Sequence, residues 1–390
     1  MSCSVPIART SLTEDEINSV LEPLRSGWLV QGKQVKCFEE KWSWFTGADR
    51  SLAVTSCTAG MHLAVSALDL GPDDEVIVPA LTWISTANVI EHQRAKPVFC
   101  DIDLETFNID VTQIEELITT RTVGIMPVHL FGLAADMAPI MAIAKKYGLW
   151  VIEDAACGFG STYGGQHVGY FGNAGVFSFH PRKAITTGEG GMVTTTDIEL
   201  ANTIQQLRDH GAVLSDLQRH LGPKPYLLAD HARAGYNQRM TDIQAALGVT
   251  QMDRAAEILY ERRAIAYLYN AAFSKLEWLR LPAEIEGCEH GYQSYPCLLM
   301  PAYASIENIK SINGTRNEWM EELQTQGIST RPATHAVHML SYYRDKYDLK
   351  PEDFPNAYIV NECSISLPLF HGMTDQEKEY VIDVVANKAF

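Results

Sequence analysis

Two side chains of this chain could do chemistry together, an aspartate and a lysine that each follow an apolar run. Asp154 closes the run LWVIED, and Lys183 lies between GVFSFH and the glycine-rich turn GEGG. A lysine amine can hold an aldehyde as a Schiff base, and a carboxylate can keep a pyridine nitrogen protonated. Pyridoxal 5′-phosphate (PLP) requires both tasks of its protein. The pair therefore predicts a PLP site with Asp154 and Lys183 as its catalytic residues.

Both residues also have an ordinary structural explanation. A loop lysine is usually solvated, and an aspartate after a strand often caps a turn. The glycines that follow Lys183 favour a functional role, because they let backbone approach a bound ligand closely. Asp154 ends a run that is apolar enough to be buried, and a buried carboxylate needs a partner. A pyridinium nitrogen would supply that partner.

The block TSCTAGMH, residues 55–62, places hydroxyls and small residues where a strand gives way to a helix. Free backbone N–H groups, the helix dipole and the hydroxyls would bind an anion there. A plain helix cap explains the same residues equally well. The candidate ligands of a cofactor phosphate are Ser56, Cys57, Thr58 and Ala59, with Ser178 beside the lysine as a further contact.

Three other segments carry candidate binding residues. Trp83, in PALTWISTAN, could stack on a planar ring, although a core tryptophan is the more common case. Asn237, in GYNQRMTDIQAALG, belongs either to a capped turn or to a set of phosphate donors from a partner subunit. The segment RPATHAVHMLSYY, residues 331–343, is either a surface loop or the wall of a substrate site. The candidate substrate-binding residues are His180, Arg331, His335 and His338.

The elements that must position these residues alternate between apolar and amphipathic runs. The predicted strands lie at 51–56, 74–80, 97–102, 122–130, 149–156 and 174–180, and a helix at 134–148 ends at a glycine. Alternating strands and helices predict an α/β fold whose mainly parallel central sheet is flanked by helices. Ligands of such sheets bind at the carboxyl ends of the strands. Ser56, Asp154 and the segment before Lys183 fall at those ends.

The remaining pattern predicts three units. An N-terminal segment, residues 1–30, is expected to pack with the small domain, and its helix begins with the capping box Thr13–Glu16. A large PLP-binding domain covers 31–255. A smaller C-terminal α/β domain covers 256–390, entered by a long helical region that ends near Phe273. The polar segment 334–354 is expected to be a loop.

Composition narrows the function further. A net charge of −17 argues against a nucleic-acid binder, whose affinity depends on neutralising phosphates. The eight cysteines are scattered without any spacing typical of metal sites, which favours a reducing compartment and no metal. No signal peptide or membrane-spanning run stands out. The chain is therefore expected to be soluble and cytoplasmic.

The blocks together resemble the DegT/DnrJ/EryC1/StrS family of PLP-dependent sugar aminotransferases, which has the aspartate-aminotransferase fold, type I. The resemblance covers nearly the whole chain and keeps the family's order. Its blocks are GWLVQGKQVKCFEEKW, TSCTAGMHLAV, PALTWISTAN, PVFCDID, PVHLFG, IEDAACGFGSTYGG, FSFHPRKAITTGEGG and GYNQRMTDIQAALG.

The resemblance implies a role for each position. Lys183 would bind the cofactor aldehyde and then carry the proton of the 1,3-shift, while Asp154 would hold the pyridine nitrogen. Trp83 would stack on the ring, and Asn237 would come from the other subunit of a homodimer. Glutamate would be the amino donor and a keto sugar linked to a nucleoside diphosphate the acceptor, as in deoxyamino-sugar and polysaccharide biosynthesis. The phosphate would be held by Ser56, Thr58, Ala59 and Ser178.

Two positions depart from the family pattern. Cys157 stands where members often carry glutamine beside the cofactor, so the contacts around the ring differ. Arg331 and Pro332 follow GIST, which resembles perosamine-synthase-like members that act on GDP-linked sugars. The expected acceptor is an NDP-4-keto-6-deoxyhexose, with the GDP-linked form favoured.

Three alternatives remain open at this point. A dehydratase or deaminating relative would carry histidine in place of the lysine, and Lys183 argues against it. An aminotransferase acting on a free keto-cyclitol would keep the same cofactor site. A regulatory or binding protein without catalytic activity is disfavoured by the intact Lys183 and Asp154 pair.

Overall fold

A seven-stranded sheet forms the centre of the computed structural model, which describes residues 4–214, 226, 228–388 and 390. Neighbouring strands run parallel from β9 through β6, β5 and β2 to β4, whereas β10 is antiparallel to both β1 and β9. The mainly parallel α/β fold is thereby confirmed. The sheet order is β1 (Arg50–Val54), β10 (Gly191–Thr195), β9 (Ala174–Ser178), β6 (Trp150–Asp154), β5 (Thr122–Ile125), β2 (Glu75–Pro79) and β4 (Lys96–Cys100).

Six of these strands lie where the sequence predicts them, and β10 is the one that the pattern misses. Its sequence GMVTT has few apolar residues, yet all five residues are buried. Successive side chains of a strand face opposite sides of a sheet. Val193 accordingly packs in one core cluster and its neighbour Met192 in another.

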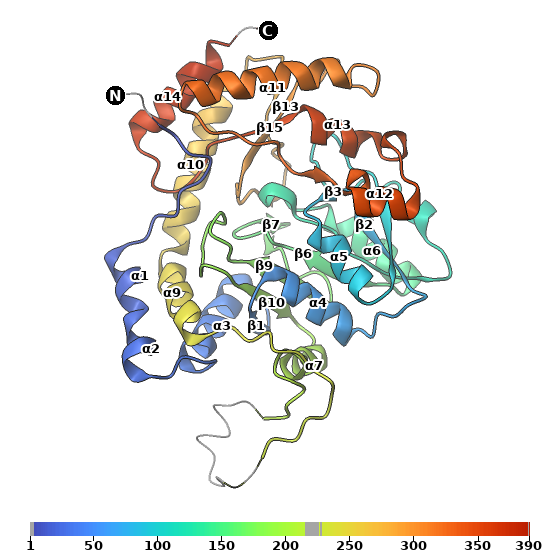
Figure 1. Ribbon diagram of the computed structural model, residues 1–390, viewed down its shortest axis with the longest axis vertical. Coiled ribbons are helices and arrows are strands. Elements are labelled where there is room, and N and C mark those ends of the chain that lie inside the picture. Colours follow the sequence, from blue (N-terminus) through green and yellow to red (C-terminus); the bar gives the residue numbers. More distant parts are fainter. Residues whose placement is uncertain (1–3, 215–225, 227, 389) are drawn as a thin grey trace.

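Helices cover both faces of the sheet (Figure 1). Side chains of α4 share a core cluster with Val176 and Val193, whereas side chains of α3 share the opposite cluster with Phe177. The predicted helix at 134–148 is α6, and Gly148 ends it at φ 69°. The helices of this region are α3 (Lys33–Thr46), α4 (Cys57–Ala67), α5 (Ser85–His92), α6 (Met137–Tyr147), α7 (Ile198–Arg208) and α9 (Asp242–Asp253), with short turns η1 (Glu115–Leu117) and η2 (Leu130–Gly132).

A three-stranded antiparallel sheet, in the order β11-β13-β15, forms a second layer toward the C-terminus. The expected long helical region is broken at Arg254 into α9 and α10, and α10 reaches toward this second sheet (Figure 1). The elements are α10 (Ala255–Phe273), β11 (Leu279–Arg280), β13 (Tyr295–Leu299), α11 (Ile309–Thr325), α13 (Pro355–Cys363), β15 (Ser364–Leu367) and α14 (Asp375–Ala386).

The N-terminal segment contacts both parts of the molecule. Val5 exchanges backbone hydrogen bonds with Gly327 and Ser329, which lie in the C-terminal part. The predicted capping box Thr13–Glu16 is present, but its helix is interrupted at Val20. The resulting helices α1 (Glu14–Ser19) and α2 (Leu21–Ser26) lie against α9. The domain boundaries stay a prediction.

The segment 334–354 corrects an expectation, because it is not simply a loop. It contains β14 (His335–Ala336), η3 (Val337–Met339), α12 (Ser341–Tyr347) and η4 (Pro351–Asp353). β14 pairs with β3 (Leu81–Thr82), which follows β2 in the chain, so this segment of the C-terminal part forms a separate two-stranded sheet with the large domain region. A further small sheet joins β12 (Cys288–Glu289), β7 (Thr162–Tyr163) and β8 (Gln166–His167).

Candidate active site

Asp154 lies at the carboxyl end of β6, and its side chain is buried. The hydroxyl of Thr86 donates to Oδ2 at 2.7 Å, and the backbone N–H of Ala156 donates to Oδ1 at 3.1 Å. The two donors approach different oxygens. The carboxylate is therefore held in one orientation at the edge of the sheet.

The preceding acid, Glu153, faces the other side of the strand and serves the fold. Its fully buried carboxylate accepts from His129 Nε2 at 2.9 Å and from the backbone N–H groups of Gly169 and Gly172 at 2.6 and 2.7 Å. These bonds occupy both oxygens. The alternation of a strand thus decides which member of the acidic pair is available for chemistry, and it is Asp154.

Lys183 lies in an irregular segment between β9 and β10. Its backbone N–H donates to the carbonyl of His180 at 2.8 Å, and its Nζ lies 3.1 Å from Sγ of Cys157. Burial raises the pKa of the Cys57 thiol well above its ordinary value. The charges of Asp154 and Cys157 raise this pKa further, and the charge of Lys183 lowers it. The four residues therefore share one electrostatic environment, which brings the predicted catalytic pair together with the phosphate turn.

The turn predicted to bind a phosphate joins a strand to a helix, as the sequence indicates. Ser56 caps α4, and its hydroxyl accepts from the backbone N–H of Ala59 at 3.0 Å. In the described part of the chain, the N–H groups of Cys57 and Thr58 have no acceptor. A Cβ on Gly191 would lie 2.6 Å from the nitrogen of Cys57, so only glycine lets β10 begin so close beneath the turn.

These donors fit PLP. The first turn of α4 offers free N–H groups and hydroxyls to a phosphate, the carboxylate of Asp154 suits a pyridinium nitrogen, and the amine of Lys183 suits an aldehyde. Trp83 is 56% exposed, unusual for a tryptophan, and its ring lies edge-to-face with His335 at 5.6 Å. A flat exposed ring at this edge suits stacking on a planar cofactor.

Ser178 and His180 flank the lysine. Ser178 ends β9, and its hydroxyl accepts from the N–H of His180 at 3.4 Å. Burial lowers the pKa of His180, the cations of Arg182 and Lys183 lower it further, and Glu189 opposes them. His180 is thus favoured as a neutral ring near the amine at neutral pH.

The segment 331–338 holds the other substrate candidates in contrasting positions. Arg331 is exposed and donates to the carbonyl of Thr330 at 2.8 Å, and His335 is exposed beside Trp83. His338 has no exposed surface and packs against Phe354, with ring centroids 4.9 Å apart. A direct contact between His338 and a substrate would require that ring to leave the core.

Asn237 is exposed and lies apart from the lysine in this single chain. Its backbone pairs with Asp209, and no contact in the described residues joins it to Lys183. The neighbouring carbonyl of Gln238 accepts from Thr55 at 3.1 Å. A role for Asn237 therefore needs a second subunit and stays a prediction.

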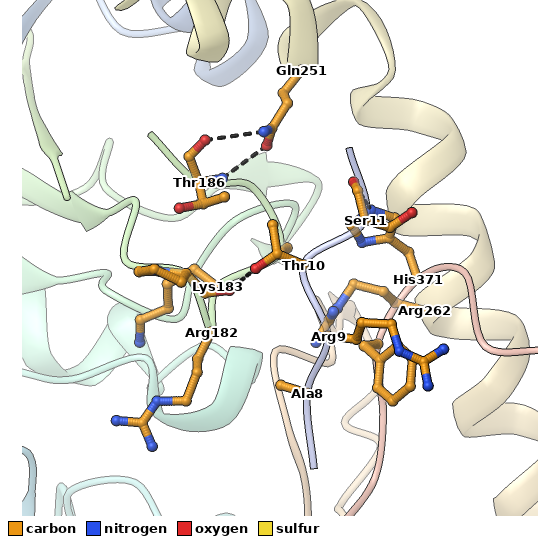
Figure 2. Close-up of a pocket in the computed structure, with 13 residues that line it drawn as sticks. Ala8, Arg9, Thr10, Ser11, Arg182, Lys183, Thr186, Gln251, Arg262 and His371 are labelled. Carbon is orange, nitrogen blue, oxygen red and sulfur yellow. Dashed lines mark hydrogen bonds between the residues drawn. The ribbon is translucent and has the colours of Figure 1, made fainter. Parts of the chain in front are cut away.

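A small hollow lies between the lysine segment and the N-terminal segment (Figure 2). Residues 8–11, the segment 181–184, Arg262 of α10 and residues 370–371 line it. A second small hollow is lined by Cys157, Ser178 and Lys183 among others. Lys183 thus lines both hollows. Among the described residues, no cluster of three or more His, Cys, Asp or Glu side chains could hold a metal ion.

Sequence reasoning missed several residues of this site. Thr86 orients Asp154, and His129 holds Glu153, yet neither stands out from its surroundings. The signal in the sequence is weak, because each is only a polar residue close to apolar ones. In addition, no helix that the structure describes is long and apolar enough to cross a bilayer.

Comparison with known proteins decides the family. The sequence model of the DegT/DnrJ/EryC1/StrS aminotransferase family matches residues 10–386. The chain belongs to this family. It is therefore a PLP-dependent aminotransferase of fold type I that acts on a sugar, as the family resemblance implies.

Individual relatives cover nearly the whole chain. An uncharacterised protein of Methanocaldococcus jannaschii is 41% identical over 98% of this chain and 96% of its own length. The spore coat polysaccharide biosynthesis protein SpsC of Bacillus subtilis is 37% identical over the same shares. The PMP form of Spr1654, a proposed sugar aminotransferase of Streptococcus pneumoniae, superimposes with a TM-score of 0.89 at 30% identity, covering 98% of this chain and 99% of its own.

Proposed function

We propose that this aminotransferase moves the amino group of L-glutamate to the keto group of a nucleotide-linked deoxysugar, an NDP-4-keto-6-deoxyhexose. The observation that carries the proposal is the environment shared by Asp154, Lys183 and the first turn of α4. A carboxylate, an amine and a capped helix start suited to a phosphate lie at the carboxyl edge of one sheet, which supports the proposal. The open surface beside them, at Trp83 and His335, leaves room for a large acceptor.

In this proposal each side chain has one task. Bound PLP supplies the electron sink that makes the C–H bond next to the nitrogen acidic. Asp154 holds the pyridine nitrogen, with its orientation set by Thr86 and Ala156. The half-buried amine of Lys183 would hold the cofactor aldehyde and, once released, would carry the proton of the 1,3-shift. The turn at Ser56, together with Ser178, holds the phosphate.

The acceptor is proposed to contact His180, Arg331 and His335. Among the described residues the guanidinium of Arg331 bonds to the Thr330 carbonyl, and the side chain is exposed, so its other donors can face a diphosphate. Arg331 is also the residue that favours a GDP-linked sugar. His338 lies behind this wall, and its contribution to substrate binding stays a prediction.

A homodimer is part of the proposal, with Asn237 reaching the cofactor phosphate of the partner. Several apolar side chains of the N-terminal segment and α10 are exposed in the single chain, which suits a subunit interface. They include Ile17, Leu24, Leu29, Val30, Tyr260 and Tyr267. We place the enzyme in the cytoplasm, a location that suits its seven described cysteines, all of which are unpaired.

A panel of acceptors tests the substrate. Purified enzyme with glutamate is offered GDP-, UDP- and dTDP-linked 4-keto-6-deoxyhexoses and a free keto-cyclitol, and the aminated products are measured by mass spectrometry. We expect turnover with a nucleotide-linked sugar, best with GDP. Turnover of the cyclitol alone would overturn the proposal. Formation of 2-oxoglutarate without any aminated product would refute the proposed sugar acceptor and leave glutamate as the donor.

Mixed dimers test the shared site. Asn237→Ala and Lys183→Ala subunits are inactive or weakened alone, but a hybrid of the two retains one intact site if Asn237 acts across the interface. We expect activity to reappear on mixing the two variants after dissociation. Hybrids that stay inactive would place Asn237 outside the partner's site.

A further inference from the structure

The segment that carries Lys183 is buried although it is neither helix nor strand. Side chains from Ala184 to Thr187 are at most 6% exposed. Backbone polar groups in a buried irregular segment need partners from other parts of the chain. Three side chains from distant regions bond to backbone of the lysine segment, one at Thr186 within the buried stretch and two at the exposed residues Pro181 and Arg182 before Lys183. They are Thr10, Gln251 and Gln293.

Gln251 makes the most complete of these contacts. It lies on α9 and is buried, its Oε1 accepts from the N–H of Thr186 at 2.8 Å, and its Nε2 donates to the carbonyl of the same residue at 3.0 Å (Figure 2). One amide thus satisfies both backbone groups of Thr186, as a neighbouring strand would. The Thr186 hydroxyl in turn donates to Phe179 at 2.8 Å and accepts from Gly188 at 3.0 Å. The backbone on both sides of Lys183 is therefore tied to Thr186.

The two residues before Lys183 are held from other directions. The hydroxyl of Thr10 donates to the carbonyl of Pro181 at 3.1 Å, and Nε2 of Gln293 donates to the carbonyl of Arg182 at 3.2 Å. Figure 2 shows the N-terminal segment crossing beside the lysine segment at this contact. The main chain of Lys183 itself bonds only within its own segment, to His180, in the described residues. Its position depends on its neighbours.

We infer that Gln251, Thr10 and Gln293 are positioning residues for Lys183, an inference that rests on the proposed role of that lysine. None of them needs to touch the cofactor or the substrate. They act through the backbone of residues 181–187, whose place sets where the amine of Lys183 can reach. A misplacement of a reacting group by about 1 Å can cost on the order of 100-fold in rate.

The first test replaces Gln251 with methionine, which keeps the volume and removes both hydrogen bonds. We expect kcat to fall about 10- to 100-fold, with KM for glutamate and for the sugar changed less than about threefold. The dissociation constant of the apoprotein for PLP, measured by absorption titration, should rise about tenfold. The melting temperature of the apoprotein separates this effect from unfolding.

The second test does not depend on that buried variant. Thr10 lies at an exposed contact, so Thr10→Val should fold normally. We expect it to slow the capture of PLP by the apoprotein and to lower kcat about two- to fivefold, and Thr10→Ser should restore both. Ser19→Ala is the matched control, because Ser19 also bonds backbone from the N-terminal segment but contacts α9 rather than the lysine segment. It should behave as wild type.

The outcomes are distinct. Unchanged PLP capture and unchanged kcat in Thr10→Val would overturn the role of the N-terminal contact, and a lower melting temperature with normal kcat in Gln251→Met would make that residue purely structural. If the wild type aminates no sugar, the proposed substrate fails, yet PLP capture by the apoprotein still tests the inference. Full activity in Lys183→Ala would remove the role on which the inference rests.

Discussion

The carboxyl edge of the large sheet and the two exposed substrate candidates of the segment 331–338, Arg331 and His335, are held in opposite ways. At the sheet edge Asp154 is buried and held by two donors, and the turn at Ser56 packs directly on β10. In the segment 331–338, Arg331 and His335 are exposed and make few contacts. Amino transfer needs the same geometry for every acceptor, so that part is rigid and enclosed. Recognition of one acceptor needs only surface groups.

The contrast predicts where mutations act. Removing a donor or an acceptor from the enclosed edge leaves a buried polar group unsatisfied, which costs about 1–3 kcal/mol before any chemistry is lost. Removing an exposed side chain from 331–338 has little cost in stability. We therefore expect changes in kcat, cofactor binding or stability at the first region, and changes in KM at the second.

The largest effect is expected for Lys183→Ala. Loss of the proton carrier should lower kcat about 10²- to 10⁴-fold while the melting temperature of the apoprotein stays within a few degrees. Borohydride should fix PLP to the wild-type protein at the peptide containing Lys183, and mass spectrometry should find no such adduct in the variant. Normal turnover by the variant would remove this lysine from the mechanism.

The two adjacent acids are expected to affect different quantities, Asp154 the turnover rate and Glu153 the stability of the fold. Asp154→Asn keeps the shape but loses the charge, so we expect kcat to fall about 10²-fold at nearly normal stability. Glu153→Gln should instead destabilise the fold by about 3 kcal/mol, because the amide NH2 replaces one carboxylate oxygen and would face the N–H donor of either Gly169 or Gly172. Chemical denaturation and steady-state kinetics of both variants check this. Equal effects on kcat would contradict the division of roles.

The close packing beneath the phosphate turn predicts an effect of intermediate size. The added methyl of Gly191→Ala would meet backbone atoms of Cys57 and Ser56 at 2.6 Å, which should cost about 1–3 kcal/mol and weaken PLP binding. Gly314→Ala is the control, since a Cβ there meets nothing within 4 Å in the middle of α11. It should stabilise by about 0.5–1 kcal/mol. Both values come from thermal or urea unfolding.

At the exposed region, Arg331→Ala should raise KM for the nucleotide-linked sugar about 10-fold and leave kcat within about twofold, as loss of a charge-assisted hydrogen bond requires. KM for glutamate should not change. Arg344→Ala removes another exposed arginine, whose contact is Asp345, and serves as the control. A fall in kcat without a change in KM would place Arg331 with the chemistry instead.

The smallest effect concerns pH. Burial lowers the pKa of His338 from 6.5 to about 4. The unfolded chain therefore binds more protons than the native protein between these values, and the free energy of unfolding falls as the pH drops through that window. His338→Phe removes this contribution. Between pH 7 and pH 5 the free energy of unfolding of the variant should therefore fall by about 1–2 kcal/mol less than that of the wild type. An equal fall in the free energy of unfolding of the wild type and the variant would show that burial does not lower the pKa of His338.

Much of the enclosed edge could be predicted from the sequence, because its signals are local. Six strands follow from short apolar runs, and Ser56 and Asp154 follow from their place at the ends of such runs. The pattern does not reveal β10, because its two threonines interrupt the apolar run that a strand buried on both faces usually has. The segment 334–354 was wrongly expected to be a loop, because its pairing with β3 is a long-range contact.

The sequence by itself determined the chemistry of this protein, since the residue types at strand ends are set by patterns a few residues long. The tertiary structure alone decided which groups hold them. Thr86 is 68 residues from Asp154, Gln251 is 65 from Thr186, and Thr10 is 171 from Pro181. A hydrogen bond needs its partners within about 3 Å, and over such separations only the packing of helices on the sheet brings them together.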